Sequence, residues 1–453
     1  MKKIFLVKII GLSLIIGLGG CTSFLDVKSD DKLAVPASLD DFLALLSHTD
    51  NVLGVAEGEV MSADHYVEDD PEIWFCQTNL DLYRWEDTPL IQECDGDIGW
   101  RAAYQNIYRA NTVLEGVKKF EEENEVSSRS SSIKGHAYFN RAISYFELAQ
   151  VWAEAYEKES ADVKLGVPLK HTADFNEPTI RPSLQKTFEQ IAGDLQKAAE
   201  LLPERQPFTK WPSKVAAWAY LARVYLYMNE FEQAGLYAGK CIDSDFHLID
   251  FNKVDSSPRF PFSPTENPEL IYFRVLTTAY YSIDINISLI DTLLYKSYAE
   301  EDLRKNLFFT IRDDGEVLFR GDYGGGMGGS FSGPTIAEMY LIVAESAIRQ
   351  GNEEKARTNL FTFLKHRMEE GYVFPDIGKD KLLSEILKER RKELLRRGVR
   401  FGDVKRLNNL GAGITLKRTV WEKDYTLPPN DPRAAALIPE DVIKLSGIEQ
   451  NPR

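Results

Sequence analysis

Histidine and cysteine, the usual ligands of structural and catalytic zinc, are scarce in this chain of 453 residues. Its six histidines lie far apart, and none has the spacing of a metal-ligand set. The glycine-rich run at residues 321–329 is not followed by the lysine of a P-loop. No nucleophile-elbow serine is present either. Carboxylate pairs are unavoidable among 70 acidic residues, so counting alone does not exclude a glycoside hydrolase. Without a site motif we expect no catalytic residue, no metal and no cofactor.

Positive charge is also in deficit. The chain has 54 lysines and arginines against 70 acidic residues, which gives a net charge of −16. A nucleic-acid partner needs a basic face, so we exclude that class of function. The acidic surface does not indicate which kind of ligand the protein binds. The hydrophobic content of 43% and aromatic content of 11% are enough for a large buried core.

A long apolar run occurs only at the start of the chain. Lys2 and Lys3 precede a mostly apolar stretch over residues 4–18, which is shorter than the roughly twenty residues of a membrane-spanning helix. This pattern predicts a secretory signal peptide over residues 1–20. The stretch ends in Leu18-Gly19-Gly20-Cys21, which resembles a bacterial lipobox with Cys21 as the lipidated residue. Multiple acyl chains on Cys21 would anchor the mature chain, residues 21–453, to a membrane.

The other cysteines have different predicted environments. Cys76 and Cys94 lie in one aromatic, irregular stretch, and an oxidising compartment would permit a disulfide between them. Sequence does not reveal their geometry, so bonded and free states stay open. Cys241 falls at a helix-packing position, where we expect a buried apolar side chain and not a reactive thiol.

Apolar and small residues recur at three- and four-residue spacing through most of the chain, which predicts a mainly α fold. Pro212-Ser213 and Pro334-Thr335 are helix-start signals, because a hydroxyl that can cap a helix follows a proline. The predicted helices span residues 100–119, 134–156, 183–202, 213–228, 231–243, 335–349, 353–368 and 381–397.

Two predicted helix pairs share the register of a tetratricopeptide repeat. Small or apolar residues fall at offsets 0, 3, 12, 16 and 19 in both pairs. Small residues there allow two helices to approach closely. The first pair carries Ala222, Tyr225, Ala234, Ala238 and Cys241, and the second carries Ala344, Ala347, Ala356, Leu360 and Phe363.

Two irregular regions interrupt the predicted helical scaffold, which covers about 100–243 and 335–406. Residues 47–99 are helix-poor, and residues 244–334 form an insertion with a glycine-rich run and short β-like pieces at 270–276 and 316–320. Loops on a rigid frame are common binding sites, so we expect the ligand there.

Aromatic residues cluster in both irregular regions. Such rings stack on the apolar faces of sugars, but they can equally fill a local core beneath a loop. We predict ligand contacts for Trp74 and Trp85 first, then for Tyr66, Phe75, Tyr83, Tyr280, Tyr281 and Tyr323. We predict packing roles for Trp100, Trp152, Trp211 and Trp218.

The stretch 389–406 carries many charges, with Glu389, Arg390, Arg391, Lys392, Glu393, Arg396, Arg397, Arg400, Asp403 and Arg406. So many arginines could hold an anion. Their alternation with carboxylates at helical spacing instead favours ion pairs along a solvated or interhelical face.

Taken in order, several further pieces resemble the SusD/RagB family over nearly the full length. They are Phe24-Leu25-Asp26, Trp100–Asn111, Arg141-Ala142 with Tyr145-Phe146 and Leu148, Gly166–Leu169, Asp194-Leu195 with Ala198 and Leu202-Pro203, Ala344-Glu345, Arg391, Glu393-Leu394, Gly398, Arg400, Asp403, Ile438-Pro439 and Gln450–Pro452. The chain departs from the family at Arg397, where an acidic residue is usual, and it is short for the family.

The resemblance implies a single SusD-like domain, a lipoprotein of the outer membrane that faces the extracellular side. It implies a protein that binds nutrient glycans and serves a SusC-like TonB-dependent transporter, without being an enzyme. A peptide ligand, as in RagB-like proteins, and a structural lid for the transporter stay as alternatives, and a glycoside hydrolase is less favoured.

Overall fold

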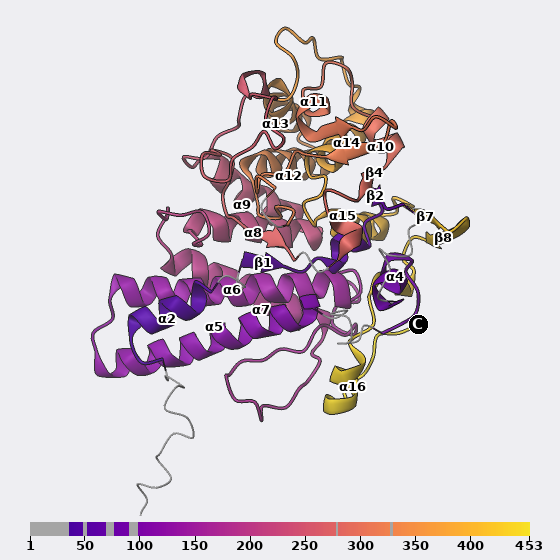
Figure 1. Ribbon diagram of the computed structural model, residues 1–453. Helices are drawn as coiled ribbons and strands as arrows, with labels where there is room; N and C mark the ends of the chain where they lie inside the picture. Colours follow the sequence, from indigo (N-terminus) through magenta and orange to yellow (C-terminus); the bar gives the residue numbers. More distant parts are fainter. Residues whose placement is uncertain (1–35, 49–51, 69–76, 90–97, 278–279, 327–328) are drawn as a thin grey trace, which may run out of the picture. The chain divides into compact units, whose positions relative to one another are not determined.

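The computed structural model describes residues 36–48, 52–68, 77–89, 98–277, 280–326 and 329–453. The chain divides into residues 1–38 and residues 39–453, and the second unit holds the fold described below. Its α-helices are α2 Leu39–Leu46, α3 Glu57–Val60, α4 Gln77–Tyr83, α5 Ile98–Glu123, α6 Ser128–Trp152, α7 Leu184–Leu201, α8 Lys214–Tyr227, α9 Phe231–Ile242, α10 Thr292–Lys296, α11 Arg304–Phe308, α12 Ile336–Arg349, α13 Glu353–Lys365, α14 Lys379–Glu393, α15 Arg400–Asn409 and α16 Glu440–Ser446 (Figure 1). Its strands are β1 Leu53–Gly54, β2 His65–Tyr66, β3 Val275–Leu276, β4 Leu289–Ile290, β5 Phe309–Ile311, β6 Val317–Phe319, β7 Leu416–Val420 and β8 Lys423–Leu427.

The helix starts follow the predicted capping signals. The Ser213 side chain accepts a hydrogen bond from the Ala216 N–H at the start of α8, and Thr335 accepts one from Glu338 at the start of α12. Both caps satisfy backbone donors that the first helical turn leaves unpaired. All eight predicted helices are confirmed, with ends that differ by a few residues.

The two predicted repeat pairs form and stack on each other. α8 packs on α9, α12 packs on α13, and α9 also packs directly on α12. The alanines at the repeat positions are 0–4% exposed, and Cys241 is fully buried with its thiol 3.6 Å from the Val215 carbonyl oxygen. Burial raises the pKa of the Cys241 thiol, which agrees with the predicted packing role. The pairs are therefore neighbours in space although the insertion separates them in sequence.

Three of the four tryptophans expected in packing roles, Trp100, Trp152 and Trp218, lie in or against the core. Trp100 and Trp152 are 5% and 0% exposed, and their rings meet edge to face at 5.2 Å. Trp218 is partly buried, with the Lys240 ammonium 5.6 Å from its ring centre, and Trp211 packs edge to face on Phe208.

The insertion between α9 and α12 has its own core and supplies three of the four strands of a small sheet. Strands β2, β4, β6 and β5 form a sheet in that order, with Leu289 opposite Leu318. An aromatic cluster packs against this sheet and includes Phe251, Phe308 and Phe319. The predicted β-like pieces contain β3 and β6, so the expected minor β content is confirmed.

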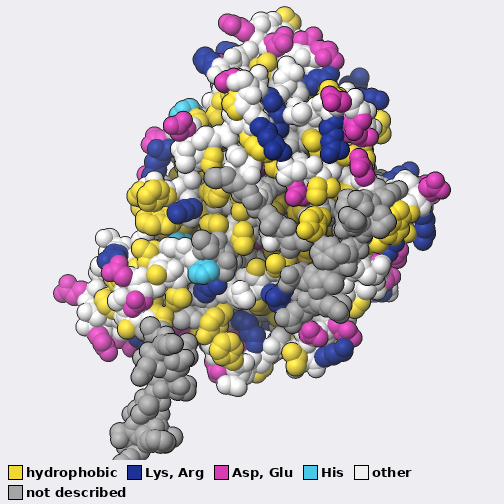
Figure 2. All heavy atoms as spheres, viewed as in Figure 1, with side chains coloured by type: hydrophobic (Ala, Val, Ile, Leu, Met, Phe, Trp, Pro, Cys, Tyr) yellow, Lys and Arg dark blue, Asp and Glu magenta, His cyan; other side chains and the backbone are white. Residues whose placement is uncertain are grey.

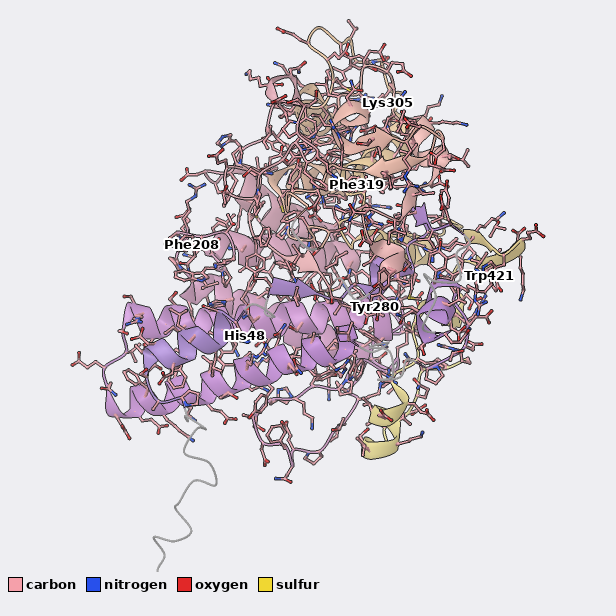
Figure 3. All side chains as sticks on the ribbon, in the orientation of Figure 1. His48, Phe208, Tyr280, Lys305, Phe319 and Trp421 are labelled. Atoms are coloured by element: carbon pink, nitrogen blue, oxygen red, sulfur yellow. The ribbon has the colours of Figure 1, made fainter. Side chains whose placement is uncertain are left out.

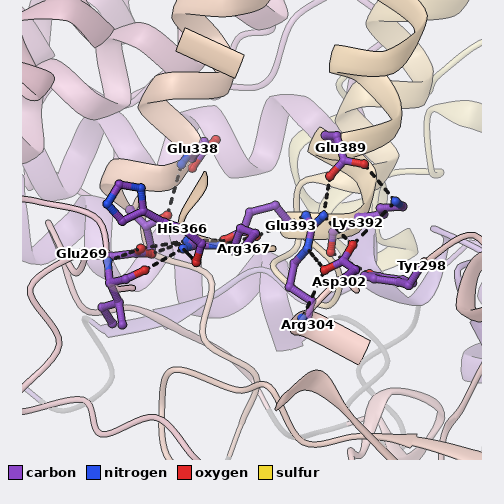
Figure 4. A network of polar contacts seen from close by, with 12 residues as sticks. Glu269, Tyr298, Asp302, Arg304, Glu338, His366, Arg367, Glu389, Lys392 and Glu393 are labelled. Carbon is purple, nitrogen blue, oxygen red and sulfur yellow. Dashed lines mark hydrogen bonds and ion pairs between the residues drawn. The ribbon is translucent and has the colours of Figure 1, made fainter. Parts of the chain in front are cut away.

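Buried ion pairs fasten the insertion to the scaffold (Figure 4). Arg367 follows α13 and pairs with Glu269 of the insertion at 2.8 Å and with Glu393 of α14 at 2.9 Å. Arg304 of the insertion pairs with Asp302 at 2.8 Å and contacts Glu389 of α14. These side chains are at most 3% exposed. The predicted ion pairs at Glu389 and Glu393 are confirmed, but they lie in the interior and not on a solvated face.

The surface is mixed in charge. On the face that Figure 2 shows, acidic and basic side chains are interspersed, so the net charge of −16 is not gathered there in one patch. In the part of the chain that the structure describes, no helix combines the length and apolar character needed to cross a membrane.

The close contact between α9 and α12 leaves little room for a larger side chain at Gly235. A Cβ atom built on Gly235 lies 3.0 Å from the Ser346 Cβ, so Gly235→Leu would push the two helices apart. We expect a loss of about 1–3 kcal/mol of stability, seen as a lower melting temperature.

Gly239 provides a matched control on the same helix, because nothing lies within 4 Å of its built Cβ. Gly239→Leu should keep or raise the melting temperature, since leucine favours helix more than glycine does. Equal melting temperatures for the two variants would contradict the close packing of α9 on α12.

Candidate ligand-binding site

Two strand pairings bring the two irregular regions of the chain together. β1 pairs with β3 in parallel, with Leu53 opposite Val275, and β2 pairs with β4 in antiparallel fashion, with His65 opposite Ile290. Each pairing joins the region around residues 47–99 to the insertion, so β2 and β4 lie side by side (Figure 1). The structure thus assembles one surface from the two segments in which we expected the ligand.

A cavity of about 500 Å³ lies beside β2. It is lined by Ala63, His65, Tyr66, Asp291, Lys417, Arg418, Thr419, Asp424, Tyr425 and Thr426. We call it the hairpin cavity, because the last six residues belong to the β7–β8 hairpin. Its volume falls within the roughly 300–1,000 Å³ of most ligand pockets.

Two tyrosines of the hairpin cavity are held in place by polar partners. The Tyr66 hydroxyl donates a 2.7 Å hydrogen bond to Glu316. Burial, together with that hydrogen bond, raises the pKa of Tyr66 above its ordinary value, so the hydroxyl stays protonated. Tyr425 accepts a hydrogen bond from Arg84 at 3.3 Å, and the Lys423 ammonium lies 4.7 Å from its ring centre. Both rings are therefore oriented before any ligand arrives.

Buried charges fix the strands beneath the hairpin cavity. Asp64, next to β2, accepts hydrogen bonds from Arg391 at 3.0 and 2.6 Å, and the Arg400 guanidinium lies 3.5 Å from its other oxygen. Arg418 of β7 donates to the Tyr83 carbonyl at 2.6 Å. These contacts tie β2 to α14 and α15 and tie the hairpin to α4.

A second hollow, of about 650 Å³, runs between residues 169–182 and α7. Its lining contains carboxylates, lysines and prolines but no Phe, Tyr or Trp side chain. Since aromatic faces supply the apolar contact that sugars use, the hairpin cavity is the better candidate for a glycan.

Tyr83 and Trp85, both predicted to contact ligand, lie in the core. Each is 1% exposed. The Arg418 guanidinium stacks on them, 3.6 Å from the Tyr83 ring centre and 5.1 Å from that of Trp85, and the Trp85 indole N–H donates to the Met61 carbonyl at 3.1 Å. A ring with 1% exposure has no face open to a sugar, so in this structure both residues support the hairpin and do not line its cavity.

Tyr280 and Tyr323 are also buried, at 1% and 0% exposure. The Tyr280 hydroxyl donates to Glu57 at 2.9 Å, and the Tyr323 hydroxyl donates to Glu269 at 3.0 Å. Their rings are closed to ligand for the same reason, and both side chains join the insertion's loops to buried carboxylates.

Two predicted contacts remain accessible in this structure. Tyr66 lines the hairpin cavity, and Tyr281 is 51% exposed on the insertion. The predicted contacts Trp74 and Phe75, the cysteines Cys76 and Cys94, and the lipidation residue Cys21 lie outside the described residues, as does the signal peptide.

The β7–β8 hairpin, which supplies most of the lining of the hairpin cavity, is absent from the elements predicted from the sequence. Residues 416–420 alternate between buried and exposed, which is the period-two signal of a half-buried strand. The turn hides the signal, because Trp421 and Glu422 adopt φ values of 49° and 60° where hairpins usually place Asn or Gly. Trp421 is 44% exposed at the outer end of the hairpin (Figure 3).

Within the ranges that the structure describes, no group of three or more His, Cys, Asp or Glu side chains is placed to hold a metal ion. The hairpin cavity instead offers hydroxyls, carboxylates, a lysine and two tyrosine rings. That set suits the recognition of a polar ligand by hydrogen bonds and stacking.

Comparison with known proteins identifies the family. One family model, described as starch-binding and associating with outer membrane, matches residues 23–226, and a second, the SusD family, matches residues 332–433. The chain belongs to the SusD family. A SusD-like protein of Formosa agariphila is 24% identical in an alignment that covers 75% of this chain and 79% of the relative.

Solved SusD structures share the fold. A SusD superfamily protein from Bacteroides thetaiotaomicron superposes with a TM-score of 0.76 at 19% identity, covering 92% of this chain and all of the other. A SusD-like carbohydrate binding protein from Bacteroides vulgatus gives a TM-score of 0.69 at 18% identity, covering 91% of this chain and 97% of the other. The resemblance seen in the sequence is thus confirmed.

Glu57, which holds Tyr280, gives this SusD-family protein a testable pH dependence. Burial raises the pKa of Glu57 to about 7, although the Gly99 N–H and the Tyr280 hydroxyl both donate to it. A raised pKa in the folded state means that folding favours the protonated form. The contribution of Glu57 to stability is therefore full below about pH 4.5 and is lost as the pH rises to about 7.

Glu57→Gln removes this titration and keeps an amide oxygen that can accept both hydrogen bonds. We expect the stability of the variant, relative to the unaltered protein, to rise by roughly 2–3 kcal/mol between pH 4.5 and 7. Denaturant unfolding of both proteins across this range measures the difference. A difference that stays constant with pH would contradict the raised pKa.

Proposed function

We propose that this protein binds nutrient oligosaccharides in the hairpin cavity and delivers them to a SusC-like TonB-dependent transporter at the outer membrane. The observation that supports binding is the hairpin cavity itself, where two oriented tyrosine rings meet hydrogen-bonding groups from three segments of the chain. Membership of the SusD family supports the class of ligand, because one solved relative is described as carbohydrate binding.

The chemistry of the hairpin cavity fits a sugar. Tyr66 and Tyr425 offer ring faces to the C–H surface of a pyranose. Carboxylates and hydroxyls of Asp291, Asp424 and Thr419 can accept or donate hydrogen bonds to sugar hydroxyls. Two basic residues, Lys417 and Arg418, balance the two acidic ones in the lining, so the cavity favours a neutral glycan.

Orientation of the rings reduces the entropic cost of binding. Tyr66 is fixed by Glu316, and Tyr425 by Arg84 and Lys423, so few rotamers are lost when the ligand stacks. We also propose that the protein binds its ligand without catalysing a reaction, because the SusD family consists of binding proteins.

A peptide is the second candidate ligand, and an edge strand favours it. β2 lies at the edge of the sheet β2-β4-β6-β5, and it borders the hairpin cavity. The free edge of a strand can pair with an extended peptide backbone. Parallel screening on glycan and peptide arrays separates these two candidates.

The cavity assignment predicts a selective loss of affinity. Tyr66→Ala and Tyr425→Ala should each weaken oligosaccharide binding about five- to thirtyfold, equivalent to about 1–2 kcal/mol of lost stacking, with little change in melting temperature. Calorimetric titration with an oligosaccharide found by array screening measures the affinity.

Two variants serve as controls. Trp85→Ala should lower the melting temperature, because truncating a buried tryptophan costs about 3–5 kcal/mol. Tyr281→Ala removes an exposed tyrosine outside the cavity lining and should leave affinity unchanged. The cavity assignment fails if Tyr281→Ala weakens binding and the two cavity variants bind normally.

Lipidation of Cys21, the SusC-like partner and an extracellular orientation complete the proposal. Their support is the lipobox and the description of the family as associating with outer membrane. We predict that Cys21→Ser yields a folded protein in the soluble fraction, because a single cysteine carries the acyl chains. Palmitate labelling with membrane fractionation tests this, and equal membrane retention of the variant would refute the anchor.

A further inference from the structure

Arg397 differs from its charged neighbours. It lies in the turn between α14 and α15 and is 3% exposed. Arg390 and Arg406, on either side of it, pair with Asp403 at 2.8 and 2.7 Å. Arg397 makes no ion pair with any carboxylate of the described residues within 4.0 Å, and its guanidinium instead lies 3.8 Å from the ring centre of Tyr323 and 4.8 Å from that of Phe331. The two rings cover the faces of the Arg397 guanidinium, but its N–H groups still need hydrogen-bond acceptors.

Arg397 lines a cavity of about 50 Å³ together with residues of α6, α8, α14 and α15. Other buried donors line the same cavity: Arg390, Tyr220, Tyr227 and Ser332. Among the described residues, no hydrogen-bond partner exists for Nε and Nη1 of Arg397, Nη1 of Arg390, or the hydroxyls of Tyr220, Tyr227 and Ser332. Guanidinium groups only donate, whereas the three hydroxyls can donate or accept, so the unpartnered N–H groups of Arg390 and Arg397 still require acceptors in the cavity.

The carboxylates at the cavity are already engaged. Glu147 and Asp403 line it, and Glu147 accepts two hydrogen bonds from Arg274 while Asp403 accepts one each from Arg390 and Arg406. Glu338 and Glu345 lie behind them and pair with the remaining arginines of the lining, Arg223 and Arg406. The lining and its ion-pair partners therefore hold five arginines, at 223, 274, 390, 397 and 406, against four carboxylates, at 147, 338, 345 and 403.

One further carboxylate acts on Arg397 from outside the cavity. Asp322 interacts with Arg397 electrostatically, but its oxygens accept hydrogen bonds from the Gly326 and Phe331 N–H groups. Burial raises the pKa of Asp322. A buried charge without a hydrogen-bonded partner is strongly unfavourable. An anion bound next to Arg397 would offset this cost.

We propose that this cavity binds a small monovalent anion, with chloride as the chemical match, held by the guanidinium groups of Arg397 and Arg390 and by the hydroxyls of Tyr220 and Tyr227. A volume of about 50 Å³ has room for a halide with one or two waters and none for a sugar or a bulky organic anion. The site is separate from the hairpin cavity, and its ligand ties α6 and α8 to the turn that carries Arg397.

The structural test uses bromide as the probe. Crystals grown in sodium bromide should show an anomalous scattering peak within about 3.5 Å of the Arg397 and Arg390 N–H groups. Density in the cavity without an anomalous peak means that water alone fills it, and that result overturns the proposal.

The solution test compares sodium chloride with sodium gluconate at equal ionic strength. Chloride should raise the melting temperature of the protein by roughly 1–3 °C over gluconate, because a ligand of the folded state stabilises it. Arg397→Gln should abolish this chloride-specific rise. Arg357→Gln, which removes an exposed-face arginine paired with Glu353 on α13, is the matched control and should retain it.

If Arg397→Gln does not fold, two measurements on the unaltered protein still test whether the cavity binds chloride. They are the comparison of chloride with gluconate and the bromide crystals. Equal melting temperatures in the two salts, or the same chloride response in Arg397→Gln as in Arg357→Gln, would overturn the proposal. Both outcomes are independent of oligosaccharide affinity, which reports on the hairpin cavity.

Discussion

The structure depends on buried ion pairs that lock the insertion to the helical scaffold. Arg367 joins Glu269 of the insertion to Glu393 of α14, and Arg304 joins the insertion to Glu389 (Figure 4). Replacing such a network with apolar residues is often neutral, whereas removing one partner costs about 3–5 kcal/mol. Its main effect is therefore geometric. Guanidinium and carboxylate groups match in only a few orientations, so the network sets where the insertion sits on α13 and α14.

The site follows from that placement. With the insertion fixed, β4 lies where β2 can pair with it, and Tyr66 comes to border the cavity beneath the β7–β8 hairpin. Asp64, bound by Arg391 and Arg400, connects the same strand to the scaffold. The candidate site thus rests on loops and short strands, while buried charge supplies the rigidity that these elements lack on their own.

Helices were predictable from sequence because their spacing repeats along the chain, and the repeat register even placed Cys241 in a packing position. The site was less predictable. Aromatic content marks the region but not the direction of each ring, so Trp85, which was predicted to contact ligand, lies in the core. The hairpin escaped notice because Trp421 and Glu422 form its turn without the usual glycine. Arg397 was predicted to share in the ion pairs of this stretch, but its guanidinium stacks on Tyr323 and Phe331 and forms no ion pair with the described carboxylates.

The central claim is that a glycan binds at the hairpin cavity. Hydrogen–deuterium exchange with and without a bound oligosaccharide tests it most directly, because the exchange of backbone amides reports protection along the whole chain. If the oligosaccharide binds in the hairpin cavity, it should slow the exchange of backbone amides in residues 63–66 and 416–427. Protection confined to the hollow along α7, residues 169–197, with the hairpin unchanged, would contradict it.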